Sequence, residues 1–328
     1  MRWLGTKTGT HLFFRNGRRV LRTKEVRPPV RPKDAAFVES KYAARMTRSP
    51  EPVLDASGSR RRGGITMPSL TLWHREMIRF FRQRHRVVSA LLTPIVLWVL
   101  LGSGLNDIVN VQADGHTPDG YRAYFFTGTL TMVLLYTAIF STITVIEDRK
   151  EGFLQSVLVA PVPRTAIVLG KVLGGSTIAM IHGLLFLLLR PIALGWPSDV
   201  SSGLVSTVAA ASLCLVMAIG LTALGLCIAW PMDSTTGFHA VMMLFLMPMW
   251  FLSGAVFPLA GAPRWLQLIM WCNPMTYGQA ALTGTLREGR TGMPLSTWQA
   301  TATTTVLSTV MVLLAVAMVR RQAKEVTT

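Results

Sequence analysis

Long hydrophobic stretches alternate with short polar ones through residues 67–328. A helix needs about 20 apolar residues to cross a hydrocarbon core of about 30 Å. Six stretches reach roughly that length, and each predicts one membrane-spanning helix: 87–106, 123–146, 166–189, 204–230, 237–257 and 297–319. The pattern therefore predicts an all-α integral membrane protein whose two ends lie on the same side.

A seventh uncharged stretch, residues 265–286, has a different character. It reads WLQLIMWCNPMTYGQAALTGTL, and Asn273-Pro274 interrupts it in the middle. Proline removes a helical hydrogen bond and also restricts the residue before it. We therefore expect residues 258–285 to form a broken hairpin, between the fifth and sixth spans, that enters the membrane only part-way. Such backbone is tolerated only against protein or a water-filled cavity.

The segment just before the first span is amphipathic. In residues 69–86, apolar side chains recur every three or four positions on one face, at Leu70, Trp73, Met77 and Phe80. Arginines recur in the same way on another face, at Arg75, Arg79, Arg82 and Arg86. This pattern predicts a helix lying in the plane of the membrane, among the inner lipid headgroups. The alternative is a plain cytoplasmic start to the first span.

Basic residues indicate the orientation of the spans. With the N-terminus inside, the inner flanks hold twelve Lys and Arg: Arg75, Arg79, Arg82, Arg84, Arg86, Arg149, Lys150, Arg164, Lys171, Arg320, Arg321 and Lys324. The outer flanks hold five: Arg122, Arg190, Arg264, Arg287 and Arg290. By the positive-inside rule both ends are cytoplasmic, in the plasma (inner) membrane. Lys171, near the start of the third span, is expected to extend to the headgroups.

Composition agrees with a membrane protein. Hydrophobic residues make up 50% of the chain and charged ones only 15%, against roughly 25% charged in an average soluble domain. The net charge of +17 does not indicate a nucleic-acid partner, because residues 1–66 alone hold sixteen Lys and Arg against five Asp and Glu. We expect this basic extension to be disordered. It is either a polybasic arm on anionic lipid or a segment upstream of a true start at Met67. Residues 322–328 are expected to be a cytoplasmic tail.

Motifs for chemistry within the chain are missing. The closest approach to a phosphate-binding GxxxxGK[ST] loop is Gly170-Lys171, but Val172 follows it and Thr165 occupies the position of the first glycine. No spacing indicates a metal site, and the three cysteines suggest no disulfide framework. His182 is the only ionisable side chain near the middle of the third predicted span, and we expect it to be hydrogen-bonded to a neighbouring helix. The chain is therefore expected to be no enzyme by itself and to bind no cofactor.

Five consecutive charges, Glu147 to Glu151, lie between the second and third spans. The full stretch reads EDRKEGFLQSVLVAPVPR, the fifth span ends in FLSGAVFPL, and NPMTYGQAAL follows. In this order and spacing the motifs resemble those of type-2 ATP-binding-cassette (ABC) permeases, such as exporters of daunorubicin-type antibiotics and nodulation factors. The resemblance covers residues 67–321 and leaves 1–66 without a counterpart.

The resemblance implies roles for several residues. The loop after the second span would be a coupling helix that docks on a cytoplasmic P-loop ATPase, with Glu147, Asp148, Arg149, Lys150, Glu151, Gly152 and Phe153 as its surface. Asn273, Pro274 and Tyr277 would belong to an outer gate. The export path would lie at the interface of a homodimer, lined by Thr127, Thr131, Ser141 and Ser253. ATP and Mg would be bound by the partner subunit only.

These expectations combine into one function: the membrane subunit of an ATP-driven exporter that moves a substrate out of the cytoplasm by alternating access. Two alternatives stay open. One is a permease-like subunit that serves assembly or signalling without an exported solute. The other is a secondary carrier or membrane enzyme that works without an ATPase.

Overall fold

The computed structural model describes residues 12–15, 18–21, 65–82, 84–105, 120–160, 162–195, 200–287, 289 and 291–325. The chain divides into two compact units, Met1–Arg61 and Arg62–Thr328.

The first unit contains a two-stranded antiparallel hairpin, β1 (Leu12–Arg15) and β2 (Arg18–Leu21). Leu12 pairs with Leu21 and Arg15 with Arg18. We predicted disorder here, and these eight residues differ from that prediction. The sequence between the strands is Asn16-Gly17, the dipeptide that most favours a two-residue hairpin connection. Aromatic and β-branched residues on both sides favour the strands.

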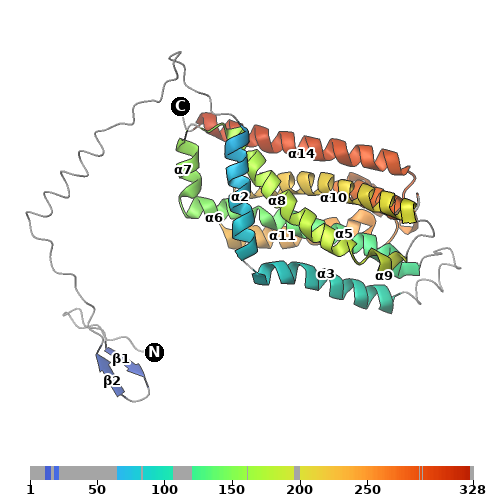
Figure 1. Ribbon diagram of the computed structural model, residues 1–328, viewed down its shortest axis with the longest axis horizontal. Helices are drawn as coiled ribbons and strands as arrows, with labels where there is room; N and C mark the ends of the chain where they lie inside the picture. Colours follow the sequence, from blue (N-terminus) through green and yellow to red (C-terminus); the bar gives the residue numbers. More distant parts are fainter. Residues whose placement is uncertain are drawn as a thin grey trace, which may run out of the picture. The chain divides into compact units, whose positions relative to one another are not determined.

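Among its described residues, the second unit consists of helices and the turns that connect them (Figure 1). Its elements are, in order, α2 (Thr66–Arg82), α3 (Arg84–Gly104), α5 (Gly120–Ser141), α6 (Ile143–Lys150), α7 (Phe153–Val159), α8 (Arg164–Leu187), α9 (Arg190–Leu194), α10 (Val200–Ala229), α11 (Thr235–Trp250), the π-helix η1 (Phe251–Ala255), the 3₁₀ turn η2 (Leu259–Gly261), α12 (Arg264–Cys272), α13 (Pro274–Leu286) and α14 (Thr297–Glu325).

In the part of the chain that the structure describes, five helical segments are long and apolar enough to cross a membrane: Gly120–Lys150, Arg164–Leu187, Ser201–Ala229, Thr235–Ala255 and Thr297–Arg321. They match the second to sixth predicted spans. The first predicted span corresponds to α3, where the apolar part, Ala90–Gly104, is shorter. The all-α membrane architecture is thus confirmed, and the count of six spans stays a prediction.

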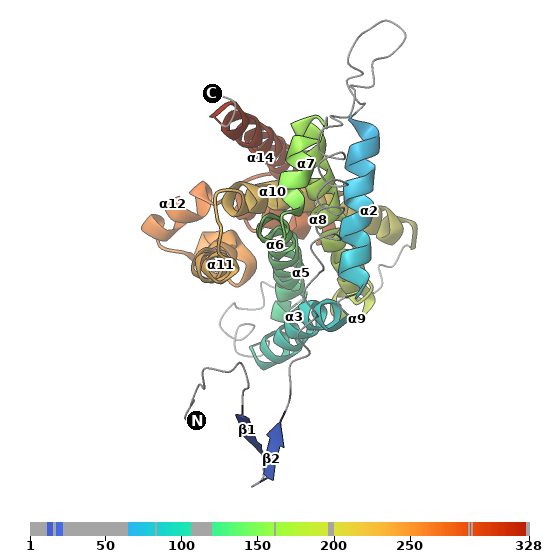
Figure 2. The ribbon, with the colours of Figure 1, turned by 90° about the vertical axis from the view of Figure 1, so that its left-hand side faces the viewer.

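The long helices run side by side, and α5 lies at their centre (Figures 1 and 2). It packs against α3, α8 and α10, so most of its side chains are buried. Phe126 of α5 stacks on Phe186 of α8 with ring centroids 5.0 Å apart. Because α5 is enclosed by protein, its polar side chains must find partners inside the chain.

Helix α2 crosses the end of the bundle where α6 and α7 lie, at a steep angle to the long helices (Figures 1 and 2). Gly170 and Gly174 of α8 let it approach closely. A Cβ at Gly170 would lie 2.7 Å from the Cβ of Leu72, and one at Gly174 would lie 2.9 Å from the Cβ of Glu76. Two small residues four apart give this kind of close helix packing in membranes.

The buried face of α2 differs from the predicted one. Met77 and Phe80 are buried as expected, but Leu70 is exposed, and Leu72 and Glu76 are buried instead. Trp73 is half-buried, and its Nε1 donates to Thr177 at 3.1 Å. The contact with α8 selects this face, which an amphipathic pattern alone places only approximately.

The predicted break at Asn273-Pro274 is confirmed. Helix α12 ends at Cys272 and α13 begins at Pro274. The side chain of Asn273 caps α13 by accepting from the backbone N–H of Met275 at 3.0 Å. A 13-residue helix is about 20 Å long, so α13 is too short to cross a membrane by itself.

Candidate functional site

An ion cluster joins three helices at the α6–α7 end of the bundle. Asp148 of α6 is fully buried and accepts from Arg75 of α2 at 2.7 and 3.0 Å. It also accepts from Arg79 of α2 at 2.9 Å and pairs with Lys171 of α8. Lys171 pairs in turn with Glu76 of α2. One carboxylate thereby binds cations from both α2 and α8, and the cluster ties the three helices together.

Lys171 does not extend to the headgroups, so that expectation was wrong. Its side chain is 5% exposed, enclosed between Glu76 and Asp148, and its Nζ also donates to Thr144 at 3.3 Å. Burying an ammonium group removes it from water at a cost in free energy. The two nearby carboxylates offset this cost, so the side chain does not need to reach the interface. The hydrogen bond from Arg75 to Asp148 also raises the pKa of Arg75 above its ordinary value, so this guanidinium stays charged.

Arg149, which follows Asp148 in the sequence, faces the loop between α10 and α11. Its guanidinium donates to the carbonyls of Trp230 and Met232 and to the carboxylate of Asp233 at 2.8 Å. It also lies over the Trp230 ring, 5.8 Å from the centroid. The adjacent Lys150 is exposed and lies 3.5 Å from the Thr235 hydroxyl. Through Arg149, α6 is therefore fixed to the connection that leads into α11.

The turn Glu151–Gly152 and helix α7 form the accessible part of this region. The side chain of Glu151 is 61% exposed. Gln155 and Ser156 are exposed, and Val159 is 88% exposed. Phe153 is half-buried under Arg75, whose guanidinium carbon lies 3.7 Å from the ring centroid. This free face, defined as Glu151, Gln155, Ser156 and Val159, is held in place from behind by Arg75 and the ion cluster.

The seven residues expected to form one coupling surface thus point in different directions. Asp148 points into the chain, and Glu147 pairs with Arg79 at 2.7 Å. Arg149 and Lys150 face the α10–α11 loop, and Glu151 belongs to the free face. Of the expected in-plane residues, Arg75 and Arg79 join the cluster, while Arg82 is exposed.

The expected gate residues lie at the start of α13. The amide nitrogen of Asn273 donates to the carbonyl of Met249 at 2.6 Å, in addition to the cap that its oxygen forms. Pro274 occupies the first turn of α13, where no N–H is needed. The Tyr277 hydroxyl donates to the carbonyl of Trp271 at 2.9 Å. Together they fix the angle between α12 and α13 and tie α13 to α11.

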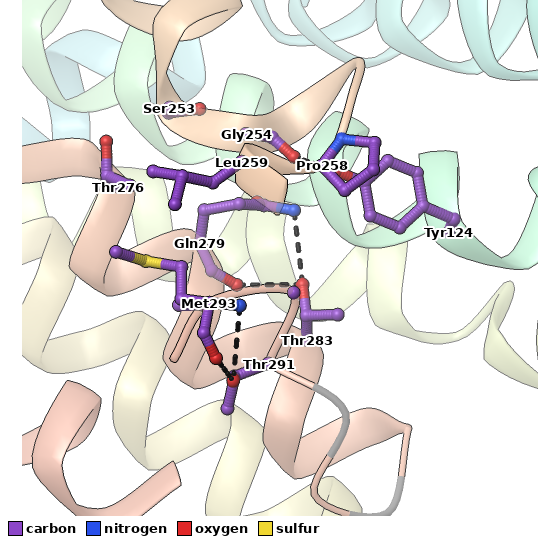
Figure 3. Close-up of a pocket in the computed structure, with 12 residues that line it drawn as sticks. Tyr124, Ser253, Gly254, Pro258, Leu259, Thr276, Gln279, Thr283, Thr291 and Met293 are labelled. Carbon is purple, nitrogen blue, oxygen red and sulfur yellow. Dashed lines mark hydrogen bonds between the residues drawn. The ribbon is translucent and has the colours of Figure 1, made fainter. Parts of the chain in front are cut away.

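The residues expected to line a path are mostly enclosed in this chain. Thr127 and Thr131 of α5 are fully buried against Gln279 of α13. The Gln279 amide lies 3.2 Å from the Thr283 hydroxyl (Figure 3). It also lies 3.2 Å from the Thr127 hydroxyl. Ser253 is buried in η1 and donates to the carbonyl of Trp250 at 2.6 Å, whereas Ser141 is only half-buried. The threonines therefore join α5 to α13 within one subunit.

Sequence reasoning missed Glu76, Lys171, Asp233 and Gln279 as members of polar clusters. A signal existed for Glu76, because it is the one acid within the basic segment 69–86 and lies four residues after Leu72. Residues four apart share a helix face, so Glu76 lies on the side of Leu72, which only the structure shows to be the buried one. Lys171 and Gln279 gave no comparable signal, since their partners come from distant parts of the chain.

Residues 69–286 match the ABC-2 type transporter family, and because this match covers more than half of the chain, the chain belongs to that family. It is therefore a multi-pass membrane protein and a permease component of an ABC transporter. ABC-2 permeases are transmembrane components and work with a nucleotide-binding ATPase subunit.

Curated relatives named "Putative transport permease ycf38" are similar over more than half of the chain. The protein from Porphyra purpurea is 27% identical over 209 residues, which are 63% of this chain and 69% of the relative. The protein from Pyropia yezoensis is 28% identical over 214 residues, 64% of this chain and 70% of the relative. That from Cyanophora paradoxa is 27% identical over 204 residues, 62% and 68% of the two chains.

Proposed function

We propose that this chain is the membrane subunit of an ATP-driven exporter and that its ATPase docks on the free face of α7. A homodimer of the chain would lie in the plasma membrane with both ends in the cytoplasm. The family supports the permease and its use of an ATPase. One observation supports the docking site on α7: its exposed face presents an apolar residue, Val159, and a polar one, Gln155. Buried ion pairs behind α7 hold this face in position.

The ion cluster suggests how motion would reach the spans. A rigid-body tilt of α7 and α6 would carry Asp148, and with it α2 through Arg75 and α8 through Lys171. Arg149 would carry the start of α11 in the same movement. Buried ion pairs are costly to separate, so these helices would move as one body. ATP and Mg would act on the partner subunit, and alternating access would follow from the tilt.

A pull-down tests this proposal. The full chain, tagged at its C-terminus, is expressed with its neighbouring genes, extracted in mild detergent and assayed for a co-purifying P-loop ATPase. We expect such an ATPase near a one-to-one ratio. The substitution Val159→Glu should remove it, because a charge replaces the apolar residue of the docking face.

The matched control is Arg321→Glu, an exposed charge change on α14 at the same end of the bundle. It should leave the ATPase bound. A permease that purifies with no ATPase would instead favour the secondary carrier or membrane enzyme. An ATPase that stays bound to both variants would place the docking surface elsewhere while still supporting the exporter.

A further inference from the structure

A cavity lies where α10, α13 and α14 pack against one another (Figure 1). Its volume is about 40 Å³, about three times the minimum that one water needs. Residues 217–224 of α10 and 304–311 of α14 contribute to its walls at steps of three, one and three positions, which places each set on one helix face. The start of α13, residues 274–278, closes it. Every residue that lines the cavity belongs to the described part of the chain.

One hydroxyl on the cavity wall is free to bind a ligand. Ser308 of α14 lines the cavity and is 9% exposed. Within the part of the chain that the structure describes, its side chain has no hydrogen-bond partner. The neighbouring threonines of the same helix differ, because each donates to the carbonyl four residues before it at 2.7–2.9 Å: Thr301, Thr303, Thr304, Thr305 and Thr309. A buried hydroxyl without a partner is unfavourable, so a ligand that pairs with it gains free energy.

Glycines on the two facing helices make room for this site. A Cβ at Gly220 of α10 would collide with the Oγ of Ser308. A Cβ at Gly278 of α13 would lie 2.5 Å from the methyl carbon of Met217. A larger residue at position 220 would therefore cover the free hydroxyl.

The chemistry of the lining selects the occupant. Apart from the two hydroxyl residues, the wall consists of Leu, Met, Pro and Gly, and the hydroxyl of Thr304 already donates to Ala300 at 2.7 Å. A buried water requires two to four polar partners, and apolar cavities stay dry. A molecule with one hydroxyl next to a hydrocarbon chain fits better. Its hydroxyl pairs with Ser308, and its carbon atoms lie against the apolar side chains.

Such a molecule can reach the cavity from the membrane. The parts of α10 and α14 that line the cavity lie inside the membrane-spanning segments Ser201–Ala229 and Thr297–Arg321. Leu224, Leu307 and Met311 are half-buried, so the cavity extends to the surface of the chain at these residues. The hydroxyl end of a ligand can therefore lie inside while the rest of its chain stays in the surrounding hydrocarbon.

We propose that this cavity binds small uncharged amphiphiles of the alcohol type, with Ser308 as the residue that binds their hydroxyl. The adjoining carbon atoms lie among the leucines and methionines of α10 and α14. The site belongs to a single subunit and requires no ATPase. A ligand bound there contacts α10, α13 and α14 at once and so stabilises their packing.

Photolabelling tests the proposal on the full chain in lipid nanodiscs. The probe is 3-azioctanol, which forms a covalent bond on irradiation, and mass spectrometry of peptides locates the label. We expect saturable labelling within residues 304–311, suppressed by an excess of 1-octanol but not by octane. Ser308→Ala removes one hydrogen bond and should raise the octanol concentration for half-suppression about fivefold.

A second pair of variants tests the cavity itself. Leu224→Phe should abolish the saturable labelling, because the larger side chain fills part of the cavity. The matched control is Leu215→Phe on the same helix, which is 42% exposed and lies outside the cavity. It should leave the labelling unchanged. Ser308→Ala removes a single oxygen atom, so the test remains decisive if Leu224→Phe does not fold.

Three results would overturn the proposal. They are labelling of 304–311 that does not saturate, equal suppression by octane and octanol, and an unchanged half-suppression concentration in Ser308→Ala. All of these measurements use the permease without an ATPase. A failure here therefore leaves the docking of an ATPase on α7 untouched, and a failed pull-down leaves this site untouched.

Discussion

Replacing Asp148 by Asn tests whether the ion cluster holds α2, α6 and α8 together. The amide keeps the shape of the side chain but removes the only fully buried charge in the cluster. Arg75, Arg79 and Lys171 would lose the carboxylate that all three contact. Removing one partner of a buried ion pair typically costs about 3–5 kcal/mol, because the remaining charges stay desolvated.

The burial of each partner decides how much it contributes to this free-energy cost. Loss of the carboxylate should cost most at Lys171 and less at the two arginines. Lys171 is 5% exposed, whereas Arg75 and Arg79 are 30% and 21% exposed and regain water more easily. For a domain of this size, about 1 kcal/mol shifts the midpoint of thermal unfolding by about 2–4 °C. We therefore expect Asp148→Asn to lower the midpoint by at least about 6 °C in mild detergent, followed by intrinsic tryptophan fluorescence.

Asp233→Asn is the matched control. Its carboxylate also accepts from an arginine, Arg149, but it is 83% exposed, and such surface pairs contribute about 0–1 kcal/mol. The double variant Asp148→Asn with Lys171→Met removes one charge of each sign and should recover part of the loss, with a coupling of about 0.5–3 kcal/mol. A midpoint for Asp148→Asn within about 2 °C of the Asp233→Asn value would refute the view that this cluster joins the helices.

Three further predictions concern other contacts. Gly174→Val should destabilise the chain by about 1–3 kcal/mol in the same unfolding assay, because the added atoms collide with Glu76 on α2. The control Gly261→Ala should be nearly neutral, because no atom lies within 4 Å of the new Cβ. Asn273→Ala should cost about 1–2 kcal/mol through the lost cap of α13 and should make the α12–α13 connection more sensitive to limited proteolysis. Arg149→Gln should reduce the ATPase activity of the co-purified complex at an unchanged ratio of the subunits. Lys150→Gln, which changes the exposed neighbouring residue, should not reduce it. Equal activity of the two variants would contradict the proposal that Arg149 transmits motion from α6 to α11.

Features that depend on neighbouring residues could be predicted from the sequence, whereas contacts between distant residues could not. Positions of the spans followed from the sequence because each helix satisfies its own backbone hydrogen bonds, so an apolar run of sufficient length is enough to predict it. The break at Asn273-Pro274 followed for the same reason, since proline acts on its immediate neighbours. The hairpin at Leu12–Leu21 shows that such a local signal can also be overlooked, because Asn16-Gly17 was visible in the sequence.

The partners of charged and polar side chains could not be obtained in this way. The charges at 147–151 lie at the end of the helical segment Gly120–Lys150 and just beyond it, yet only the folded chain shows that Asp148 points inward to Lys171 while Glu151 stays exposed. Lys171 lies 23 positions from Asp148 and 95 from Glu76, and no periodicity links residues at such separations. The sequence alone therefore determined where this protein forms helices and which of them are apolar enough for a membrane. Tertiary packing decided which charges face each other, because desolvation makes burial possible only where helices from distant segments bring opposite charges into contact.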